Sequence, residues 1–146
     1  MFRTYPSLLR CVLYSLTGLT HIPADTLDRF ENHIVRASIR SDLEPGLVLA
    51  VVMEESGGDP EALSHKGAQG LMQLMPQTGK QTARSLKIRY RGNQALLHSD
   101  QNIRLGSAYL NKLLKRYNGS PVLAAAAYNA GPHRVSRWLL TGKSMK

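Results

Sequence analysis

The chain has 146 residues, a length typical of one domain with its own hydrophobic core. Hydrophobic residues make up 42% of it, which excludes a disordered chain, and a formal net charge of +9 indicates an anionic partner such as nucleic acid, a membrane surface or a cell-wall polymer. The single cysteine, Cys11, excludes an intramolecular disulfide framework. No apolar run is long enough to predict a transmembrane helix.

The charge is unevenly distributed along the chain. Residues 41–79 hold six acidic residues and one basic residue, whereas residues 80–146 hold thirteen basic residues and one acidic residue, Asp100. A basic half of this kind is typical either of solvated helix faces or of a surface that binds a polyanion, and the sequence leaves both interpretations open. The acidic middle segment is chemically distinct and contains two adjacent glutamates, Glu54 and Glu55.

The N-terminal segment carries no clear export signal. Arg3 and Arg10 resemble the charged region of a signal peptide, but polar residues interrupt the apolar stretch 11–19 and no small-x-small cleavage site follows it. We therefore expect an amphipathic helix over residues 5–17. We expect residues 1–44 as a whole to form an N-terminal helical segment that packs on a domain spanning residues 45–146.

Two helices are predicted before the glycine-rich middle of the chain. Pro23 opens a helix that runs to about Arg40. Its apolar positions, spaced three and four residues apart, are Leu27, Phe30, Ile34 and Ala37. Pro45 opens a second helix over residues 46–56, and the apolar run in it covers every side, which is typical of a buried helix.

The middle of the chain predicts a loop between helices. Residues 61–79 are punctuated by glycine and indicate a structured loop that enters a helix after Pro76, and residues 84–98 are polar. Ser99 or Asp100 then caps a long helix that stops at Gly119. The inner face of that helix comprises Ile103, Gly106, Leu110, Leu113 and Tyr117.

Two short helices complete the chain. Pro121 opens one over residues 122–129, whose four consecutive alanines allow another helix to approach closely. Pro132 opens the last helix. Its inward-facing residues are Val135, Trp138 and Leu139. Since no alternating strand pattern of useful length is present, the fold is predicted to be mainly α, in a single domain.

Glu55 is the strongest candidate for chemistry. It follows the apolar run at the C-terminal end of the second helix, where burial, the neighbouring Glu54 and the negative end of the helix dipole all raise the pKa of a carboxyl group. A carboxyl group that is protonated near neutral pH can act as a general acid and then as a general base. The alternative is that both glutamates are ordinary solvated residues at a helix end.

Other common chemistries lack their patterns. No phosphate-binding glycine-rich loop and no nucleophile elbow are present. The five histidines, at positions 21, 33, 65, 98 and 133, form no ligand pair at helical spacing, so we predict no metal site and no cofactor.

Four sequence blocks occur in a recognisable order. They are Glu55-Ser56 followed by Asp59-Pro60 and Ser64; Gly67-Ala68-Gln69-Gly70-Leu71-Met72-Gln73-Leu74-Met75-Pro76; Asp100-Gln101-Asn102-Ile103 with Gly106 and Tyr109-Leu110; and Ala126-Ala127-Tyr128-Asn129-Ala130-Gly131-Pro132 with Val135 and Trp138-Leu139. In this order and spacing the chain closely resembles the catalytic domain of the soluble lytic transglycosylases, the SLT family, over roughly residues 45–140. The resemblance implies a lysozyme-like fold.

The resemblance also implies an activity and one catalytic residue. These enzymes cleave the β-1,4 bond between N-acetylmuramic acid and N-acetylglucosamine in peptidoglycan and leave a 1,6-anhydromuramic acid end. The family's catalytic glutamate precedes the serine, which is Glu55 here, and Glu54 is expected to be dispensable. A second carboxylate is not required, and of the candidates Asp59, Glu61 and Asp100 we expect Asp59 to cap the turn that follows it.

The matching positions imply a set of substrate-binding residues. These are Ser56, Ser64, Gln73, Met75, Ala127, Tyr128 and Asn129. Tyr128 is expected to place its hydroxyl near Glu55, and Gly70 and Gly131 to allow close backbone approach or tight turns. Met72 is open to interpretation as core filler. Two glycines, Gly57 and Gly58, stand where many relatives have a large side chain.

The resemblance leaves the biological setting open. It implies peptidoglycan strands as partner, a location in the periplasm or cell envelope, and a monomer, with wall recycling, assembly of an envelope or secretion apparatus, and phage entry as possible roles. Two other functions compete with it: a lysozyme-type hydrolase on the same fold, and a basic helical nucleic-acid-binding protein. The second explains the charge but not the ordered blocks.

Overall fold

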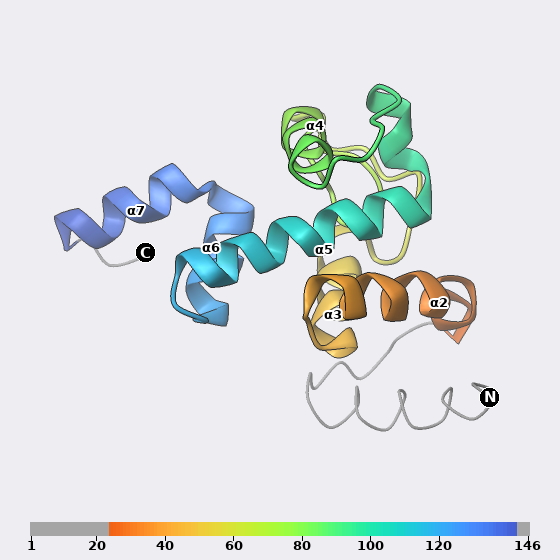
Figure 1. Ribbon diagram of the computed structural model, residues 1–146, viewed down its shortest axis with the longest axis horizontal. Coiled ribbons are helices and arrows are strands. Elements are labelled where there is room, and N and C mark those ends of the chain that lie inside the picture. The colour runs from red at the N-terminus through yellow and green to blue at the C-terminus, as the bar shows by residue number, and fades with distance from the viewer. Residues whose placement is uncertain (1–23, 143–146) are drawn as a thin grey trace.

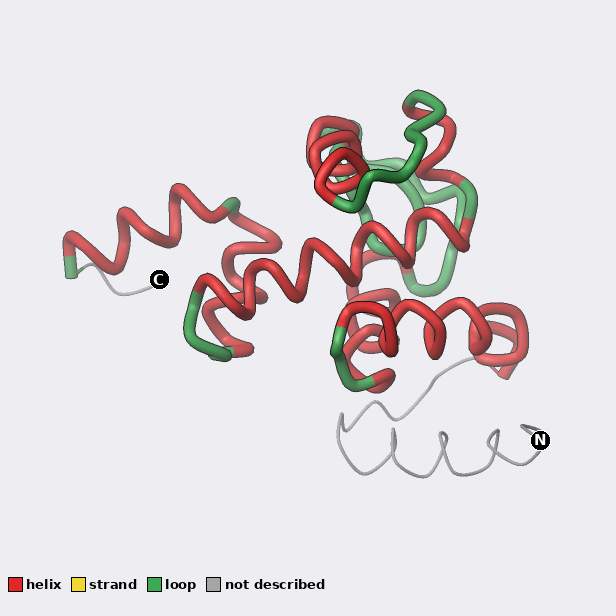
Figure 2. The backbone as a smooth tube through the Cα atoms, viewed as in Figure 1, coloured by secondary structure: helices red, strands yellow, loops and turns green. Residues whose placement is uncertain are grey.

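A long central helix organises the molecule. The computed structural model describes residues 24–142, and its helix α5 (Ser99–Arg116) runs through the middle with the other helices arranged around it (Figure 1). The remaining elements are α2 (Ala24–Ser41), α3 (Pro45–Ser56), α4 (Pro76–Ser85), the short 3-10 helix η1 (Asn93–Leu97), α6 (Pro121–Ala130) and α7 (Pro132–Thr141). Figure 2 shows helices joined by loops in the described part, where strand pairing is limited to isolated bridges from Gln69 to Leu63 and Leu74. The mainly α prediction is confirmed.

Three groups of buried side chains join the helices to α5. Around its first half, Phe30 and Ile34 of α2 and Val48, Leu49 and Val52 of α3 pack with Ile103. On another side of α5, Leu105 packs with the loop residue Leu74, Ala83 of α4 and Leu96 of η1. At its C-terminal end, Leu113 and Tyr117 pack with Ala124 and Ala127 of α6 and Val135 of α7. Burial of this apolar surface is the main force that holds the helices together.

Proline begins four of the helices. Pro45, Pro76, Pro121 and Pro132 each occupy the first position of their helix. Proline is well suited to this position because its fixed φ angle is helical and its missing N–H would have no partner there. The predicted helix starts at these prolines are confirmed. The predicted amphipathic helix over 5–17 and Cys11 lie outside the described residues.

The helix α3 carries apolar residues on every side for two reasons. Val48, Leu49 and Val52 are fully buried in the core, as a buried helix requires. Leu47, Ala50 and Val51 are only half-buried, because they line a cavity between α3, α5 and α6. The sequence predicted a helix buried on every side, which is wrong for this second face.

The loop between α3 and α4 is held against α5 by one buried side chain. The Asn102 amide nitrogen Nδ2 donates to the carbonyl oxygens of Gln69 and Leu96 at 2.9 and 2.7 Å, and its Oδ1 accepts from the Met72 N–H at 2.8 Å. Gly70 has a φ of +74°, and a Cβ there would collide with the Leu96 carbonyl and the Asn102 side chain. The predicted need for glycine at position 70 is confirmed.

Three sequence predictions differ from the structure. The residue before α5 is His98, and Ser99 is already helical, so neither Ser99 nor Asp100 is the cap; the His98 side chain makes no capping hydrogen bond. Leu139 was predicted to face inward, but 57% of it is exposed, because α7 contacts the rest of the domain along one narrow face around Val135. The segment 84–98 contains η1, whose buried Ala95 and Leu96 were not recognised.

Candidate active site

A cavity of about 300 Å³ lies where α3, α5 and α6 meet. Its apolar wall comes from Leu47, Ala50 and Val51 of α3, Leu110 and Leu114 of α5, and Pro121, Ala124 and Ala125 of α6. Its polar groups are Glu54, Glu55, Tyr128 and Asn129. An apolar cavity with a few convergent polar groups is typical of a small-molecule or substrate site.

Glu55 reaches the cavity from the last turn of α3. The helix ends one residue later, at Ser56, because Gly57 takes the left-handed conformation with a φ of 62° and its N–H donates to the Met53 carbonyl. Glu55 is half-buried, and this desolvation, followed by the nearby charge of Glu54, raises the pKa of its carboxyl group. The sequence predicts both of these effects on the pKa, and both favour the protonated form of the carboxyl group.

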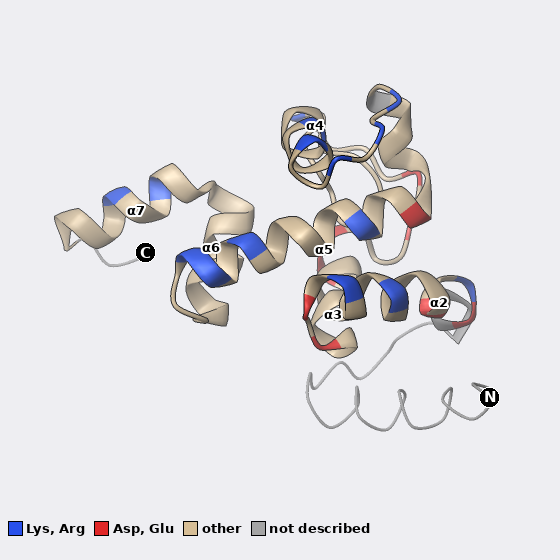
Figure 3. Ribbon diagram, in the orientation of Figure 1, with Lys and Arg blue, Asp and Glu red and all other residues tan. Residues whose placement is uncertain are grey.

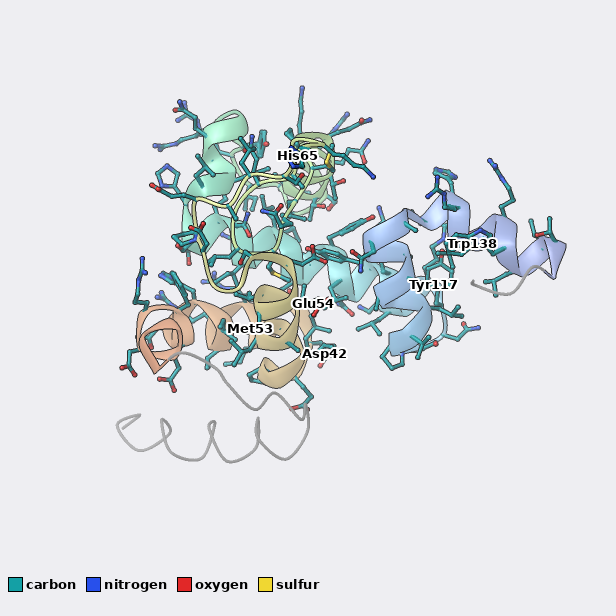
Figure 4. All side chains as sticks on the ribbon, turned by 180° about the vertical axis from the view of Figure 1, so that it is seen from behind. Asp42, Met53, Glu54, His65, Tyr117 and Trp138 are labelled. Carbon is teal, nitrogen blue, oxygen red and sulfur yellow. The ribbon has the colours of Figure 1, made fainter. Side chains whose placement is uncertain are left out.

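Glu54 shares the cavity but differs in environment. It is exposed, and Figure 4 shows it on α3, on the side turned toward α5 and α6. The two neighbouring carboxyl groups therefore differ in solvation, and only that of Glu55 is half-buried, with its pKa raised by this burial and by the charge of Glu54.

Tyr128 joins the two sides of the site. Its hydroxyl donates to the Met72 carbonyl oxygen at 2.7 Å, and its ring lies 5.4 Å from that of Tyr109, centroid to centroid. Burial, then the charge of Glu55, then Tyr109 raise the pKa of Tyr128 well above its ordinary value, so its hydroxyl keeps its proton. Tyr128 is therefore close to Glu55, as expected, but its single hydrogen is given to Met72 rather than to the carboxyl group.

Four of the other predicted residues belong to the loop that ends at α4 or to its junction with α3. The Ser56 hydroxyl lies within hydrogen-bond distance of the carbonyl oxygens of Val52 and Leu71, at 3.0 and 2.8 Å. Ser64 accepts from the Ala68 N–H, and the Gln73 amide donates to the carbonyl oxygens of Ala62 and Gly70, both at 3.0 Å. Met75, just before α4, is 42% exposed. None of these four side chains lines the cavity.

The last two predicted residues lie on α6. Asn129 is exposed and lines the cavity. Ala127 is fully buried against Leu113, Tyr117 and Val135, so its side chain offers no surface to a ligand and instead determines how closely α5 and α6 approach. The structure thus gathers Glu55, Tyr128 and Asn129 in the cavity and places the other predicted residues outside it.

Two of the other candidate carboxylates, Asp59 and Asp100, have partners elsewhere. Asp59 accepts from the Glu61 N–H at 2.9 Å, so the prediction that it caps its turn is confirmed. Asp100 lies 3.3 Å from the ring nitrogen Nδ1 of His33 on α2. Among residues 24–142, Glu54 is the only carboxylate besides Glu55 that lines the cavity. Over the same range no group of three or more His, Cys, Asp and Glu side chains forms a metal site.

Sequence reasoning missed much of the cavity wall. Leu47, Leu110 and Leu114 were assigned to helix cores or not singled out, yet they line the cavity. The one available signal was α3 itself, which is more apolar than a helix with a single buried face needs to be. No helix in the described part of the chain is both long and apolar enough to cross a membrane.

Comparisons with known proteins show the family to which the chain belongs. Residues 32–146 match the family model described as Transglycosylase SLT domain. The soluble lytic murein transglycosylase of Salmonella typhimurium is 39% identical over 99 residues, which cover 67% of this chain and 15% of that protein. The chain therefore spans less than a fifth of the length of this relative.

Solved structures of similar proteins share the fold. An inactive variant of the lytic transglycosylase Slt from Pseudomonas aeruginosa superposes with a TM-score of 0.76 at 36% identity, covering 92% of this chain and 21% of that one. The 70-kDa soluble lytic transglycosylase in complex with bulgecin A superposes with a TM-score of 0.75 at 30% identity, covering 82% of this chain and 19% of that one. The lysozyme-like fold is confirmed.

Proposed function

Because the chain belongs to the transglycosylase SLT domain family, we propose that it is a peptidoglycan lytic transglycosylase with Glu55 as its single general acid and base. Its substrate is the β-1,4 bond between N-acetylmuramic acid and N-acetylglucosamine, and its product is a 1,6-anhydromuramic acid end. The observation that carries the proposal is a half-buried carboxyl group with a raised pKa inside an otherwise mostly apolar cavity.

One carboxyl group is sufficient for this reaction. The protonated Glu55 gives its proton to the glycosidic oxygen while the C1–O bond breaks, and the substrate's own N-acetyl carbonyl assists departure of the leaving group. The Glu55 carboxylate then takes the proton of the C6 hydroxyl as that oxygen bonds to C1. No water is consumed, and Glu55 ends in the protonation state in which it began.

The surroundings of Glu55 support both steps. A raised pKa keeps enough of the acid protonated for the first step, and the apolar wall of leucines and alanines limits the water that could compete with the C6 hydroxyl. Ordinary glycosidases place a second carboxyl group about 5–9.5 Å from the first. Glu54 adjoins Glu55 on the same helix and is exposed, so we assign it neither the role of nucleophile nor that of general base.

The residues predicted to bind sugar fall into two groups under this proposal. Tyr128 and Asn129 line the cavity and contact the glycan beside the cleaved bond. Ser56, Ser64 and Gln73 shape the loop that leads to Met75, through the hydrogen bonds described above. We propose that the exposed Met75 contacts the sugar chain farther along the strand. A substrate in the cell wall implies a location in the periplasm or cell envelope.

The experiment compares two neighbouring glutamates. We expect Glu55→Gln to abolish clearing of a suspension of purified cell walls, while Glu54→Gln, its matched control one residue away, remains substantially active. Circular dichroism shows whether both variants are folded. Full activity in a folded Glu55→Gln variant would overturn the assignment of Glu55.

A further inference from the structure

A second hollow lies between α2, α4 and α5, away from the candidate active site. It has a volume of about 410 Å³, and its lining residues are Arg40, Ser41, Leu86, Arg104, Ala108 and Asn111. Arg40 and Ser41 end α2, Leu86 follows the last residue of α4, and the other three come from α5. Two guanidinium groups from different helices therefore share one small hollow.

The polar side chains of this hollow have no hydrogen-bond or ion-pair partner among residues 24–142. The ion pair found among residues 24–142 joins His33 to Asp100, so neither arginine is neutralised by a carboxylate in the described part of the chain. No hydrogen bond within those residues uses the side chains of Arg40, Ser41, Arg104 or Asn111. Asp42 follows Ser41, but it does not line the hollow. Arg40, Arg104, Ser41 and Asn111 therefore present positive charge and hydrogen-bond donors that no acceptor in the described part of the chain binds.

The negative C-terminal ends of α2 and α4 do not neutralise the two arginines. The C-terminal carbonyls of α2 already accept from the N–H groups of Asp42 and Leu43, and those of α4 from residues 86–88. The C-terminal end of a helix carries about half a negative charge. The two ends together therefore supply about one negative charge against the two positive charges of the arginines. About one net positive charge remains to attract an anion. Arg104, moreover, lies within α5 and not at a helix end.

The hollow is distinct from the cavity that holds Glu55. Arg104, Ala108 and Asn111 follow each other at steps of four and three residues and so share one face of α5. Leu110 and Leu114, which line the Glu55 cavity, lie about a third of a turn away around the helix. Figure 3 shows Lys and Arg on α2, α4 and α5, and acidic residues in the first half of α2, near α3 and at the start of α5.

We propose that this hollow is a binding site for an oxyanion, a carboxylate or a phosphate group, held by Arg40 and Arg104 with Asn111 and Ser41 as additional donors. Guanidinium groups match the two-oxygen edge of both anions, and arginine remains charged at every relevant pH. Peptidoglycan stem peptides carry carboxylates and other wall polymers carry phosphates. The cell wall as source of the anion rests on the proposed function, whereas binding of the anion does not.

The test is an NMR titration of the complete chain at low ionic strength. One arm uses inorganic phosphate and the other an N-acetylated alanine dipeptide, which supplies a carboxylate; sodium chloride at matched ionic strength is the reference. We expect saturable shifts of the Asn111 and Ser41 signals, with Kd on the order of millimolar. The double variant Arg40→Gln/Arg104→Gln is expected to bind at least about ten-fold more weakly, because the loss of one charge-assisted contact alone predicts about ten-fold and this variant removes two.

The control is a double variant that removes two positive charges at a site away from the hollow. Arg134→Gln/Arg137→Gln lies on the exposed side of α7 and should leave the titration unchanged. Saturation in one arm or both supports the proposal and identifies whether phosphate or carboxylate is bound. Shifts no larger than those with chloride, or equal weakening in both double variants, would overturn it. Wall-clearing activity is measured separately, so failure of the proposed function does not alter this result.

Discussion

Replacing Asn102 with alanine tests how the loop carrying Gln73 and Met75 is held in place. The side chain is fully buried and makes hydrogen bonds of 2.7, 2.8 and 2.9 Å with Leu96, Met72 and Gln69. Alanine leaves the Leu96 carbonyl oxygen and the Met72 N–H buried without a partner, whereas the Gln69 carbonyl still accepts from the Leu74 N–H at 3.0 Å. Each such group costs about 1–3 kcal/mol, so the free energy of unfolding should fall by about 2–6 kcal/mol.

This loss is a large fraction of the free energy of unfolding of a typical domain, which is about 5–15 kcal/mol. Urea unfolding followed by circular dichroism measures it as a lower midpoint at unchanged slope. The matched control is Asn32→Ala, an exposed position on α2, for which we expect a change within about 0.5 kcal/mol. A loss below about 1 kcal/mol for Asn102→Ala would refute the claim that these three bonds hold the loop.

Three further substitutions test the surroundings of Glu55. Tyr128→Phe removes the donor to the Met72 carbonyl and should lower the free energy of unfolding by about 1–2 kcal/mol, more than Tyr90→Phe, whose bond is longer at 3.4 Å; equal losses would contradict this. Glu54→Gln removes a like charge, lowers the pKa of Glu55 and should move the alkaline limb of the pH–activity profile to lower pH, whereas an unmoved limb argues against coupling. Because burial raises the pKa of Glu55, its ionisation destabilises the folded state as pH rises through that pKa. Glu55→Gln should therefore be the more stable protein at neutral pH in urea unfolding, with a difference that shrinks in acid; a less stable variant at neutral pH would be unexpected.

Most of the helices could be predicted because their signals are local. Apolar residues at three- and four-residue steps identify α2 and α7, and a proline at the first position marks the starts of α3, α6 and α7, without knowledge of their partners. The start of α5 was misplaced by one or two residues because Ser99 and Asp100 are good capping residues that the structure does not use as caps. Leu139 was assigned inward because a helical period identifies a face but not how much of it a neighbour covers.

The candidate site was predictable only in part. The half-buried position of Glu55 and its raised pKa could be predicted, because its apolar helix and its neighbour Glu54 both indicate them. The partner of the Tyr128 hydroxyl could not, because Met72 is 56 residues away in the chain and meets it only through tertiary packing. Ala127 illustrates the same limit: the motif places it beside Tyr128, but the helix turns its side chain into the core.

The most direct test of the central claim is mass spectrometry of the fragments released from purified peptidoglycan by the unmodified chain. If Glu55 alone supplies the acid and the base, and the C6 hydroxyl is the nucleophile, the new muramic acid ends will carry the 1,6-anhydro bond and will be lighter by one water. Reducing ends without anhydro ends would contradict the account and identify the enzyme as a hydrolase of the lysozyme type.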